Sequence, residues 1–377
     1  MPAELVFWIA VAIPLYAFAG YPLVLLGLGL VIRREVKKAP IRPLVSLLIP
    51  AYNEARVMAR KIENSLALEY PADRIEVVIV SDGSSDDTVD IARHVAFQTG
   101  GVRVLALPEN GGKVAALNAA VPELRGEIIV FSDASAMPAP DSVSRLVENF
   151  ADPAVGAASG RYRVVKPNEV NIGGSEDIYW KYEAFLKTQE SRLESTLGAH
   201  GHLHAIRREL YPFPPAETIN DDYVIPLSVL GRGFRAVYEP AAVVYEEARE
   251  MTGFGRRIRI MAGNLQQLRH LGQLLSPWRP LPVLFFLSHK VVRLLVPFAM
   301  LLALAANFLL LGSPPYRVLL CAQLLFYALA VIGLTGRLRP RALRLPFYFC
   351  MVNSAAFFGL YHALHVAMTR RRSMAWK

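Results

Sequence analysis

Long uncharged runs of hydrophobic residues stand at both ends of the chain, and a mixed polar region lies between them. The first run, 5–32, has roughly 28 residues, more than the about 20 that an α-helix needs to cross a bilayer. It predicts one membrane helix, bent near Pro14 or Pro22. Three further apolar runs, each long enough to span a membrane, follow the central region: 294–311, 318–334 and 345–368.

The central region, 44–275, alternates short β-rich runs with helical ones. This order predicts an α/β domain with a mostly parallel sheet covered by helices on both faces. Ligands of such sheets bind at the carboxyl ends of the strands. The chain thus divides into an N-terminal membrane helix with a basic linker (1–43), one α/β domain (44–275) and a C-terminal membrane region (276–377). Strands are expected at 45–50, 75–81, 102–107 and 127–132, and helices at 54–68, 87–98 and 113–124.

Charged residues beside the apolar runs predict how the chain sits in a membrane. Glu4 precedes the first run and a basic cluster follows it, which is unlike a secretory signal peptide and places the central region in the cytoplasm. His289, Lys290 and Arg293 lie at helical spacing opposite apolar residues, which predicts a helix in the membrane interface before three C-terminal segments. With four full spans, the tail Arg370–Arg372 would end outside, against the positive-inside rule. Either one stretch does not cross the membrane, or the tail breaks the rule.

Composition agrees with a membrane protein. The 377 residues are 53% hydrophobic and only 19% charged, with a mean hydropathy of +0.31, which excludes a disordered protein and an ordinary cytosolic enzyme. Much of the net charge of +9 lies beside the apolar runs, where membrane anchoring explains it, so nucleic acid is not expected as a partner. Both cysteines, Cys321 and Cys350, lie in apolar runs, which excludes a disulfide framework and a zinc cluster.

Polar, turn-forming segments follow the first two predicted strands. Pro50, Tyr52 and Glu54 bring an aromatic ring and polar groups to the sheet edge, which suits a planar base. A helix start capped by Asn53 explains this segment equally well. Asp82 ends the second strand before a tight turn, and its carboxylate is expected to be free to accept from an imide or a hydroxyl. An ordinary turn rich in Asp, Gly and Ser is the alternative.

Two further segments indicate contacts with phosphate and with a cation. In Asn110–Lys113, backbone donors and a lysine stand at a helix N-terminus, where phosphate oxygens bind; a plain turn is the alternative. The segment is neither a Walker loop nor a dinucleotide fingerprint, because the glycine spacing differs. Asp133 follows an apolar strand, where a carboxylate can bind a hard divalent cation that also contacts a diphosphate.

The order of these segments resembles that of family 2 glycosyltransferases, which include cellulose, chitin and hyaluronan synthases and ceramide glucosyltransferase. The resemblance covers about 45–263 and the plan of membrane segments on both sides. It implies a GT-A nucleotide-sugar domain with transmembrane helices at both ends, in an integral protein of the bacterial inner membrane. The matching motifs are PAYNE (50–54), DGSSDDT (82–88), NGGK (110–113), SDAS (132–135) and a later Asp-Asp pair (221–222).

The resemblance implies roles on the donor side. Lys113 resembles a lysine that contacts the donor, and Asp133 matches the first aspartate of the family's metal motif, with Mg²⁺ or Mn²⁺ as the implied cofactor. Ser135 stands where the family has the second aspartate, so the metal is expected to rest on one carboxylate and the diphosphate. The residues that match the nucleotide pocket are Pro50, Tyr52, Glu54 and Asp82.

The resemblance also implies the catalytic residues. Asp221 and Asp222 resemble the family's acidic pair, of which the second residue is the general base; an acidic helix N-terminus is the alternative. Arg259 falls where the synthases have QxxRW and is implied to stabilise the leaving diphosphate, with contact to lipid headgroups as the alternative. Arg256 and Ile260 replace the Gln and Trp of that motif, which places processive synthesis in doubt. The residues implied on the acceptor side are Tyr179, Trp180, His200 and His202.

We therefore expect an inverting hexosyltransferase that moves one sugar from a nucleoside diphosphate sugar to a hydroxyl of a lipid or a lipid-linked glycan. The resemblance favours a UDP-sugar, and membrane lipids are expected partners. A processive synthase that extrudes its polymer is the alternative enzyme. From other classes, a nucleotide-binding pseudoenzyme or a transporter stays open, although strand-end carboxylates and few intramembrane charges fit a transporter poorly.

Overall fold

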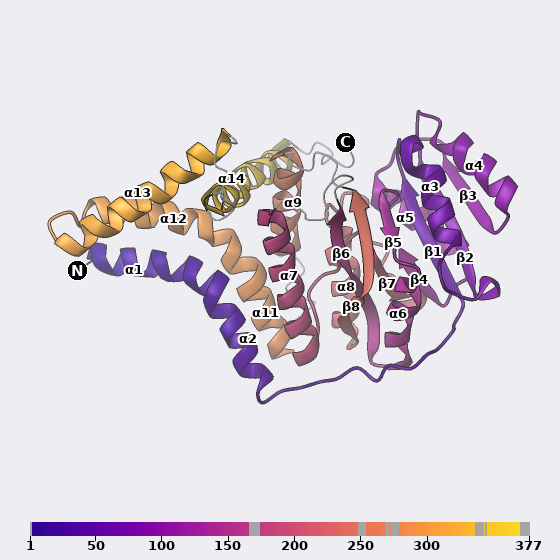
Figure 1. Ribbon diagram of the computed structural model, residues 1–377. Coiled ribbons are helices and arrows are strands. Elements are labelled where there is room, and N and C mark those ends of the chain that lie inside the picture. The colour runs from indigo at the N-terminus through magenta and orange to yellow at the C-terminus, as the bar shows by residue number, and fades with distance from the viewer. Residues whose placement is uncertain are drawn as a thin grey trace.

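The computed structural model describes residues 2–165, 174–247, 254–268, 272, 279–335, 343 and 345–369. Within 174–178, 254–257 and 362–369 it describes the backbone alone. An α/β domain and a group of long helices lie side by side, joined by α7 (Gly174–Leu193) and α9 (Phe254–Gln267) (Figure 1). The tail Arg370–Arg372 lies outside the described residues.

The α/β domain is built on a sheet with the strand order β3-β2-β1-β4-β7-β6-β8-β5. The first four strands in this order are parallel, whereas β7 is antiparallel to both of its neighbours and β5 is antiparallel to β8. The expected mostly parallel sheet is confirmed, and all four predicted strands are present. The strands are β1 (Val45–Ala51), β2 (Ile75–Asp82), β3 (Val102–Leu107), β4 (Ile128–Phe131), β5 (Ala136–Pro138), β6 (Val155–Val165), β7 (His204–Arg207) and β8 (Arg235–Glu247).

Helices cover both faces of this sheet, because its parallel strands are apolar on both sides. In β1, Leu47 and Ile49 face one core and Leu48 faces the other, as the period of two in a strand requires. The first core is closed by α3 (Ala55–Leu66), α4 (Thr88–Thr99) and α6 (Ser142–Glu148). The second is closed by α5 (Lys113–Ala120), α7 (Gly174–Leu193) and α8 (Asp221–Gly231).

Three helices of the described residues are long and apolar enough to cross a membrane: Pro2–Gly29, Pro280–Phe308 and Pro314–Leu334. The first consists of α1 (Pro2–Leu15), a π-helical turn (Tyr16–Gly20) and α2 (Tyr21–Gly29). The chain bends at this turn (Figure 1), between the two prolines that predicted a bend. The other helices of this region are α11 (Pro280–Phe285), a π-helical turn (Phe286–Val291), α12 (Val292–Phe308), α13 (Pro314–Leu334) and α14 (Leu345–Thr369).

The segment expected to lie in the membrane interface is continuous with the next apolar run. Residues 280–308 form one helix, and His289 is only 3% exposed. Its basic side faces α7 rather than lipid headgroups, because Glu183 and Glu190 of α7 pair with it. The prediction of a helix in the membrane interface, separate from the next apolar run, is therefore corrected.

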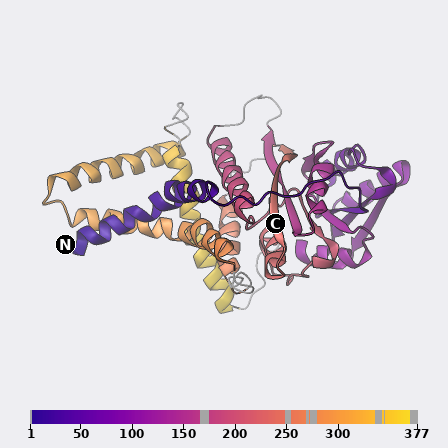
Figure 2. The same cartoon turned by 90° about the horizontal axis from the view of Figure 1, so that it is seen from below.

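Helix α14 runs across the direction of α12 and α13 (Figure 2) and packs on α9 (Phe254–Gln267). Gly359 lies at this crossing, where an added Cβ would stand 2.6 Å from the Cβ of Met261. Only a glycine lets the two helix backbones approach so closely. The crossing fixes α9 against the membrane helices.

Candidate active site

The strands β1, β2 and β4 end at one edge of the sheet, and the order of the chain reverses between β1 and β4. Crevices for ligands form outside the carboxyl ends of the strands at such a reversal. The loops after these strands carry the PAYNE, DGSSDDT and SDAS segments. The predicted donor-side residues therefore share one edge.

Asp82 at the end of β2 fixes the loop that leads to Lys113. Its Oδ1 accepts from Gly111 N at 2.9 Å and its Oδ2 from Gly112 N at 2.8 Å, and the side chain is fully buried. Gly83 makes the turn with φ +63°, and a Cβ there would stand 2.5 Å from the backbone N of Asn110. The prediction that this carboxylate is free is thus corrected, because both of its oxygens hold the neighbouring loop.

The loop after β1 is tied to the loop after β2. Asn53 has φ +53°, and its Oδ1 accepts from Ser85 N at 2.9 Å. The first donors of α3 go instead to the other loop: Glu54 N donates to Thr88 Oγ1 at 2.8 Å, and Ala55 N to Asp86 Oδ2 at 3.2 Å. Asn53 is therefore not the helix cap. Pro50 is buried in β1, and Tyr52 and Glu54 are half-buried at the edge.

Lys113 connects the donor-side and catalytic segments. Its Nζ lies 2.8 Å from Asp133 Oδ1 and 3.1 Å from Asp221 Oδ2. Burial alone would lower the pKa of Lys113, but the two carboxylates outweigh it and raise that pKa. Burial alone would raise the pKa of Asp133, but Lys113 and His202 outweigh it and lower that pKa. Lys113 is therefore a fixed cation in contact with two carboxylates.

Asp222 stands one residue into α8, beside this cluster. Burial and the neighbouring Asp221 raise the pKa of Asp222 above that of an ordinary aspartate. Its backbone O accepts from Ala199 N at 2.7 Å, and a Cβ on Gly201 would stand 3.3 Å from its Oδ2. The 199–201 loop thus packs closely on this carboxylate. A raised pKa suits a carboxylate that must accept a proton.

Glu246 of β8 is a member of the site that the sequence did not predict. Its Oε1 accepts from Ser135 Oγ at 2.6 Å, and its Oε2 accepts from Tyr162 OH at 2.8 Å and lies 3.1 Å from His202 Nε2. Burial alone would raise the pKa of Glu246, but His202, Ser135 and Tyr162 outweigh it and lower that pKa to about 2. Ser135, which replaces the second aspartate of the family's motif, thus binds a carboxylate from another strand.

Lys61 of α3 is a second member that the sequence did not predict. Its side chain is fully buried, and its Nζ donates to Ser132 Oγ at 2.7 Å and to Ala136 O at 2.5 Å. Burial lowers the pKa of Lys61 to about 7, although Asp133 acts in the opposite direction. Lys61 therefore holds the turn that carries Asp133, because it donates to residues on both sides of that aspartate.

The residues predicted on the acceptor side divide into two groups. Trp180 and His200 pack together, with ring centroids 5.6 Å apart, and His200 also contacts Tyr238 at 5.8 Å. Burial lowers the pKa of His200 well below its usual range, so its ring is neutral. Tyr179 instead lines a cavity of about 650 Å³ between the α/β domain and the membrane helices. Only Tyr179 of the four predicted residues lies on this cavity.

Helix α9 contacts Asn220, the residue that directly precedes the acidic pair Asp221–Asp222. Asn220 caps α8, and its Nδ2 lies 3.3 Å from both Ile260 O and Asn264 Oδ1 of α9. A Cβ on Gly263 would stand 2.5 Å from the Asn220 amide. Arg259 is half-buried on the same helix, one residue before Ile260. Its predicted role at the leaving group stays a prediction.

Gly263→Ala is expected to lower kcat about tenfold while leaving donor affinity unchanged. The added methyl must displace the Asn220 amide and break its bonds to α9, which shifts the start of α8 and its acidic pair, and a small misplacement of a catalytic group is costly. Steady-state kinetics measures the effect. Gly272→Ala is the control, because no described residue lies within 4 Å of its Cβ position. Equal kcat in the two variants would contradict the role of this contact.

Comparison with known proteins agrees with the resemblance. The sequence model for the family described as "Glycosyl transferase family 2" matches residues 46–212. The chain is 38% identical over 185 residues to a beta-monoglucosyldiacylglycerol synthase of Trichormus variabilis, which covers 48% of this chain and 40% of that protein. It is 26% identical over 231 residues to a poly-beta-1,6-N-acetyl-D-glucosamine synthase of Staphylococcus aureus, which covers 59% and 55%.

A solved structure is similar over almost the whole chain. The mannosyltransferase from Pyrobaculum calidifontis, in complex with GDP-Man and Mn²⁺, has a TM-score of 0.73 and 27% identity. The match covers 95% of this chain and 99% of that one, so it includes the membrane helices. The chain spans about half the length of the curated relatives it matches, between 40% and 52% for those of Trichormus, Bacillus subtilis and Rhizobium leguminosarum.

Proposed function

Because the sequence model of family 2 glycosyltransferases matches residues 46–212, we propose that the protein is a membrane-bound inverting glycosyltransferase. It transfers one sugar from a nucleoside diphosphate sugar to a hydroxyl of a lipid or a lipid-linked glycan. One observation carries this proposal: Lys113 joins Asp133 to the acidic pair at the sheet edge, beside a cavity walled by membrane helices. Such an arrangement lets a cytoplasmic donor meet an acceptor that stays in the membrane.

The donor binds at the carboxyl edge of the sheet. Its diphosphate lies near Lys113 at the start of α5, where backbone donors and a lysine favour phosphate oxygens. The resemblance favours uridine as the base, whereas the similar mannosyltransferase structure holds GDP-Man. A panel of donors, scored by release of nucleoside diphosphate, identifies the base and the sugar. Release with any donor also separates an enzyme from a pseudoenzyme or a transporter.

A divalent metal fits the residues at this edge if the donor supplies most of its ligands. Asp133 is partly exposed, and its Oδ2 has no hydrogen-bond partner among the described residues. No group of three or more His, Cys, Asp or Glu in the described part of the chain could hold a metal ion. Mg²⁺ or Mn²⁺ would therefore be held by Asp133 and diphosphate oxygens, and it would offset the charge of the leaving diphosphate.

The protein's own residues account for the proton and for part of the charge. Asp222 accepts the proton of the acceptor hydroxyl. At the same time the hydroxyl oxygen forms a bond to the anomeric carbon of the sugar, on the face opposite the diphosphate. The bond to the diphosphate breaks in the same step, so the configuration of the sugar inverts. Lys113 stays protonated and stabilises the negative charge that develops on the diphosphate.

Excess chelator is expected to stop turnover, and Asp133→Ala is expected to weaken metal-dependent donor binding at least about tenfold. The reason is that the ion links the protein to the diphosphate. Titration of the protein with donor, with and without Mn²⁺, measures the metal-dependent part of donor affinity. Asp141→Ala, an exposed carboxylate on another loop, is the control. Full activity in excess chelator would contradict the proposed metal.

We propose a membrane orientation with three spans rather than four. With the N-terminus outside, Pro2–Gly29 crosses inward, so the α/β domain lies in the cytoplasm. Pro280–Phe308 then crosses outward, and Pro314–Leu334 crosses back to the cytoplasmic side. Helix α14 then lies on the cytoplasmic side against α9 and does not cross. Under this arrangement the basic tail also ends inside, in agreement with the positive-inside rule.

Product size tests whether the enzyme adds one sugar or many. Ile260 offers no aromatic face to a growing chain, so we expect one added hexose per acceptor lipid. Mass spectrometry of the products from donor and membrane lipid measures this. Tyr179 and Tyr182 line the cavity and offer aromatic faces, which favours the processive alternative. A ladder of masses from donor alone would establish that alternative.

A further inference from the structure

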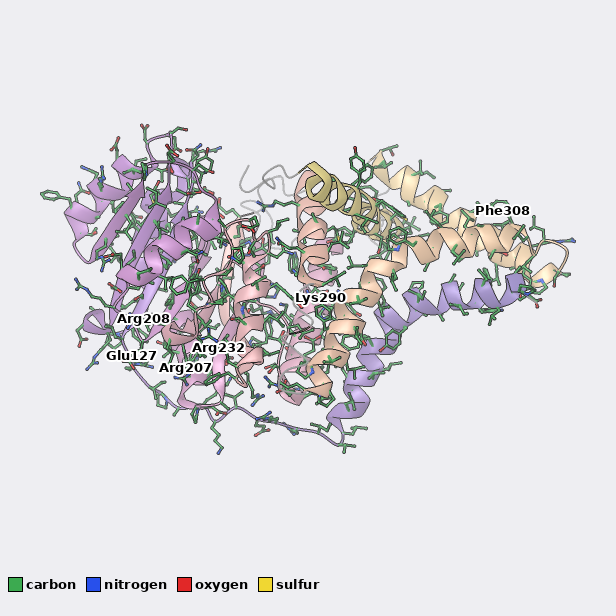
Figure 3. All side chains as sticks on the ribbon, turned by 180° about the vertical axis from the view of Figure 1, so that it is seen from behind. Glu127, Arg207, Arg208, Arg232, Lys290 and Phe308 are labelled. Carbon is green, nitrogen blue, oxygen red and sulfur yellow. The ribbon has the colours of Figure 1, made fainter. Side chains whose placement is uncertain are left out.

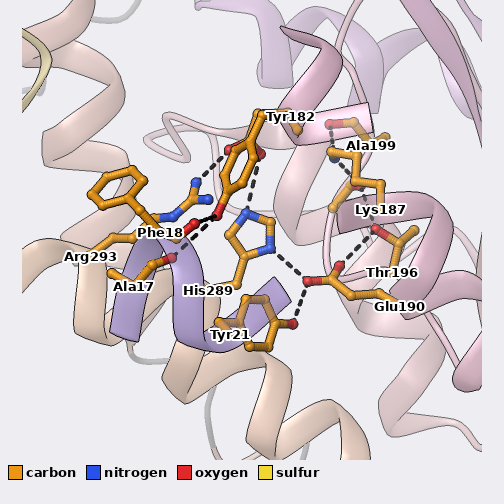
Figure 4. Close-up of polar contacts among 12 residues, drawn as sticks. Ala17, Phe18, Tyr21, Tyr182, Lys187, Glu190, Thr196, Ala199, His289 and Arg293 are labelled. Atoms are coloured by element: carbon orange, nitrogen blue, oxygen red, sulfur yellow. Dashed lines mark hydrogen bonds and ion pairs between the residues drawn. The ribbon is translucent and has the colours of Figure 1, made fainter. Parts of the chain in front are cut away.

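The charged residues that line the cavity, here called its floor, are Glu183, His289, Lys290 and Arg293. They lie where the C-terminal helices meet α7, and Figure 4 shows polar contacts in this region. His289 lies between two carboxylates, 2.6 Å from Glu190 Oε1 and 3.2 Å from Glu183 Oε2. Arg293 Nη1 pairs with Glu183, and Tyr21 OH donates to Glu190 at 2.7 Å. The two carboxylates of α7 are therefore occupied by groups from α2, α12 and the turn before it.

Positive charge exceeds negative charge in this floor. Lys187 donates to the carbonyls of Gly198 (2.6 Å) and Ala199 (3.3 Å), not to a carboxylate. Lys290 Nζ lies 5.2 Å from the centroid of the Tyr223 ring and has no ion pair with a carboxylate among the described residues. Lys187 and Glu190 do not line the cavity, so on its lining the cations Lys290 and Arg293 face a single carboxylate, Glu183. Burial and the proximity of Lys290 lower the pKa of Lys187 to about 8.

Arg293 also has donors without acceptors. Its Nε and Nη2 are buried and lack a hydrogen-bond partner in the described structure, although its guanidinium stacks on Phe18 and Tyr182 at 5.4 Å from each ring centroid. Leaving a buried charged donor unbonded is costly. An anionic ligand in the cavity would accept from these donors and offset the excess charge.

The remaining walls of the cavity are apolar and mostly aromatic. The residues of these walls come from segments far apart in the sequence, from Phe18 in the first long helix to Val352 in α14. Such walls suit a hydrocarbon tail. The aromatic side chains are Phe18, Tyr179, Tyr182, Phe326, Tyr348 and Phe349.

The charged floor also lies next to the proposed general base. Tyr223, whose ring Lys290 covers, directly follows Asp222 in α8. The charges of Lys187 and Lys290 act on Asp222 and lower its pKa, against the larger effect of burial. Lys290 is found between the α/β domain and the membrane helices (Figure 3). A group bound at Lys290 is therefore close to the place of reaction.

We propose that this cavity binds the acceptor as a phosphate-bearing lipid, with the phosphate at Lys290 and Arg293 and the tail along the aromatic walls. The hydroxyl that receives the sugar lies beyond the phosphate, toward Asp222. This inference rests on the proposed function and narrows its acceptor class. A neutral acceptor such as diacylglycerol would leave the Arg293 donors unbonded and the excess charge uncompensated.

Lipid retention by the purified full-length protein tests the proposal. Two lipid pairs differ only in the phosphate-bearing group: phosphatidylglycerol against diacylglycerol, and a long-chain prenyl monophosphate against the prenol. Native mass spectrometry measures how much of each lipid stays bound. We expect at least one phosphate lipid to be retained about tenfold better than its neutral counterpart. Equal retention within both pairs would overturn the proposal.

Two variants test the named residues. Lys290→Gln is expected to lower retention of the phosphate lipid about tenfold and to leave the neutral lipid unchanged. Arg293→Lys keeps a cation beside Glu183 but removes the two unbonded donors, so a similar selective loss is expected without loss of folding. Arg317→Gln, an exposed cation at the start of α13, is the control and should behave as the wild type. Unchanged retention in both test variants would overturn the assignment of these residues.

Transfer assays separate the failure of this inference from failure of the proposed function. If sugar is transferred to phosphatidylglycerol at the same rate by the wild type and by Lys290→Gln, the glycosyltransferase function stands and the phosphate site is wrong. If no donor yields nucleoside diphosphate with any acceptor, the proposed function is wrong. Retention of the phosphate lipid is measured without donor and does not depend on that result.

Discussion

Asp222→Asn is expected to lower kcat about 10³-fold and to leave donor affinity within about twofold of the wild type. The substitution keeps the size of the side chain and its place at the start of α8, but an amide cannot accept the proton of the acceptor hydroxyl. Release of nucleoside diphosphate measures turnover, and titration with donor measures affinity. Near-normal turnover would show that Asp222 is not the base.

The pH profile gives an independent check of the same residue. Burial and Asp221 raise the pKa of Asp222, and only the ionised form accepts a proton. The wild-type kcat/KM is therefore expected to fall as the pH drops through this raised pKa, at a higher pH than for an ordinary aspartate. Asp222→Asn should lack this acid limb. Asp73→Asn, whose side chain is 81% exposed, is the control and should keep it.

Lys113→Met is expected to lower kcat/KM about 10²-fold or more. It removes the cation that faces the leaving diphosphate and leaves Asp133 and Asp221 without their shared partner. Because Lys113 lowers the pKa of Asp222, its loss should also move the acid limb of the profile to higher pH. Steady-state kinetics across a pH series measures both effects.

A matched control separates this site effect from the loss of any ion pair. Arg60→Met breaks the pair with Glu247, in which both side chains are about half exposed. Exposed pairs contribute little, so this variant should keep wild-type kinetics. If Lys113→Met lost activity but kept the position of the acid limb, the proposed coupling between Lys113 and Asp222 would be wrong.

Much of the fold could be predicted from the sequence, because its strongest signals are local. The strand 102–107 is found with the predicted bounds, since a β-rich run between turn residues suffices to define it. The three helices that are long and apolar enough to cross a membrane were predicted from run length, although run length also predicted a span at 345–368, in α14. The antiparallel place of β7 between β4 and β6, and the pairing of β6 with β8, were not predicted, because they depend on contacts distant in the sequence.

The candidate site was predicted where the chemistry lies next to a strand end. Lys113, Asp133 and Asp221 were singled out from their motifs, and the structure brings them into direct contact. Glu246 and Lys61 were missed because nothing in their local sequence marks them. They join the site only through strand pairing and helix packing, Glu246 through the β5–β8 pair and Lys61 through the face of α3.

The basic residues at 289–293 show why a correct pattern can give a wrong position. Their spacing opposite apolar residues is typical of an interfacial helix. The carboxylates that pair with them lie in α7. For His289 these partners, Glu190 and Glu183, stand 99 and 106 residues earlier in the sequence. A local pattern carries no information on such a partner.

Helix α9 has a consequence for how this chain can be recombined with its relatives. It is fitted on one side to Asn220 through Gly263 and on the other side to α14, whose Gly359 packs against Met261. A chimera joined between α9 and α14 would bring together helices from two different proteins. Even an alanine at the position of Gly263 or Gly359 would then push α9 away from its neighbour. A junction just before Phe254 would likewise separate Gly263 from Asn220. The unit of exchange therefore begins before Asn220 and extends through α14, so the boundary between modules lies inside what the sequence presents as a single α/β domain.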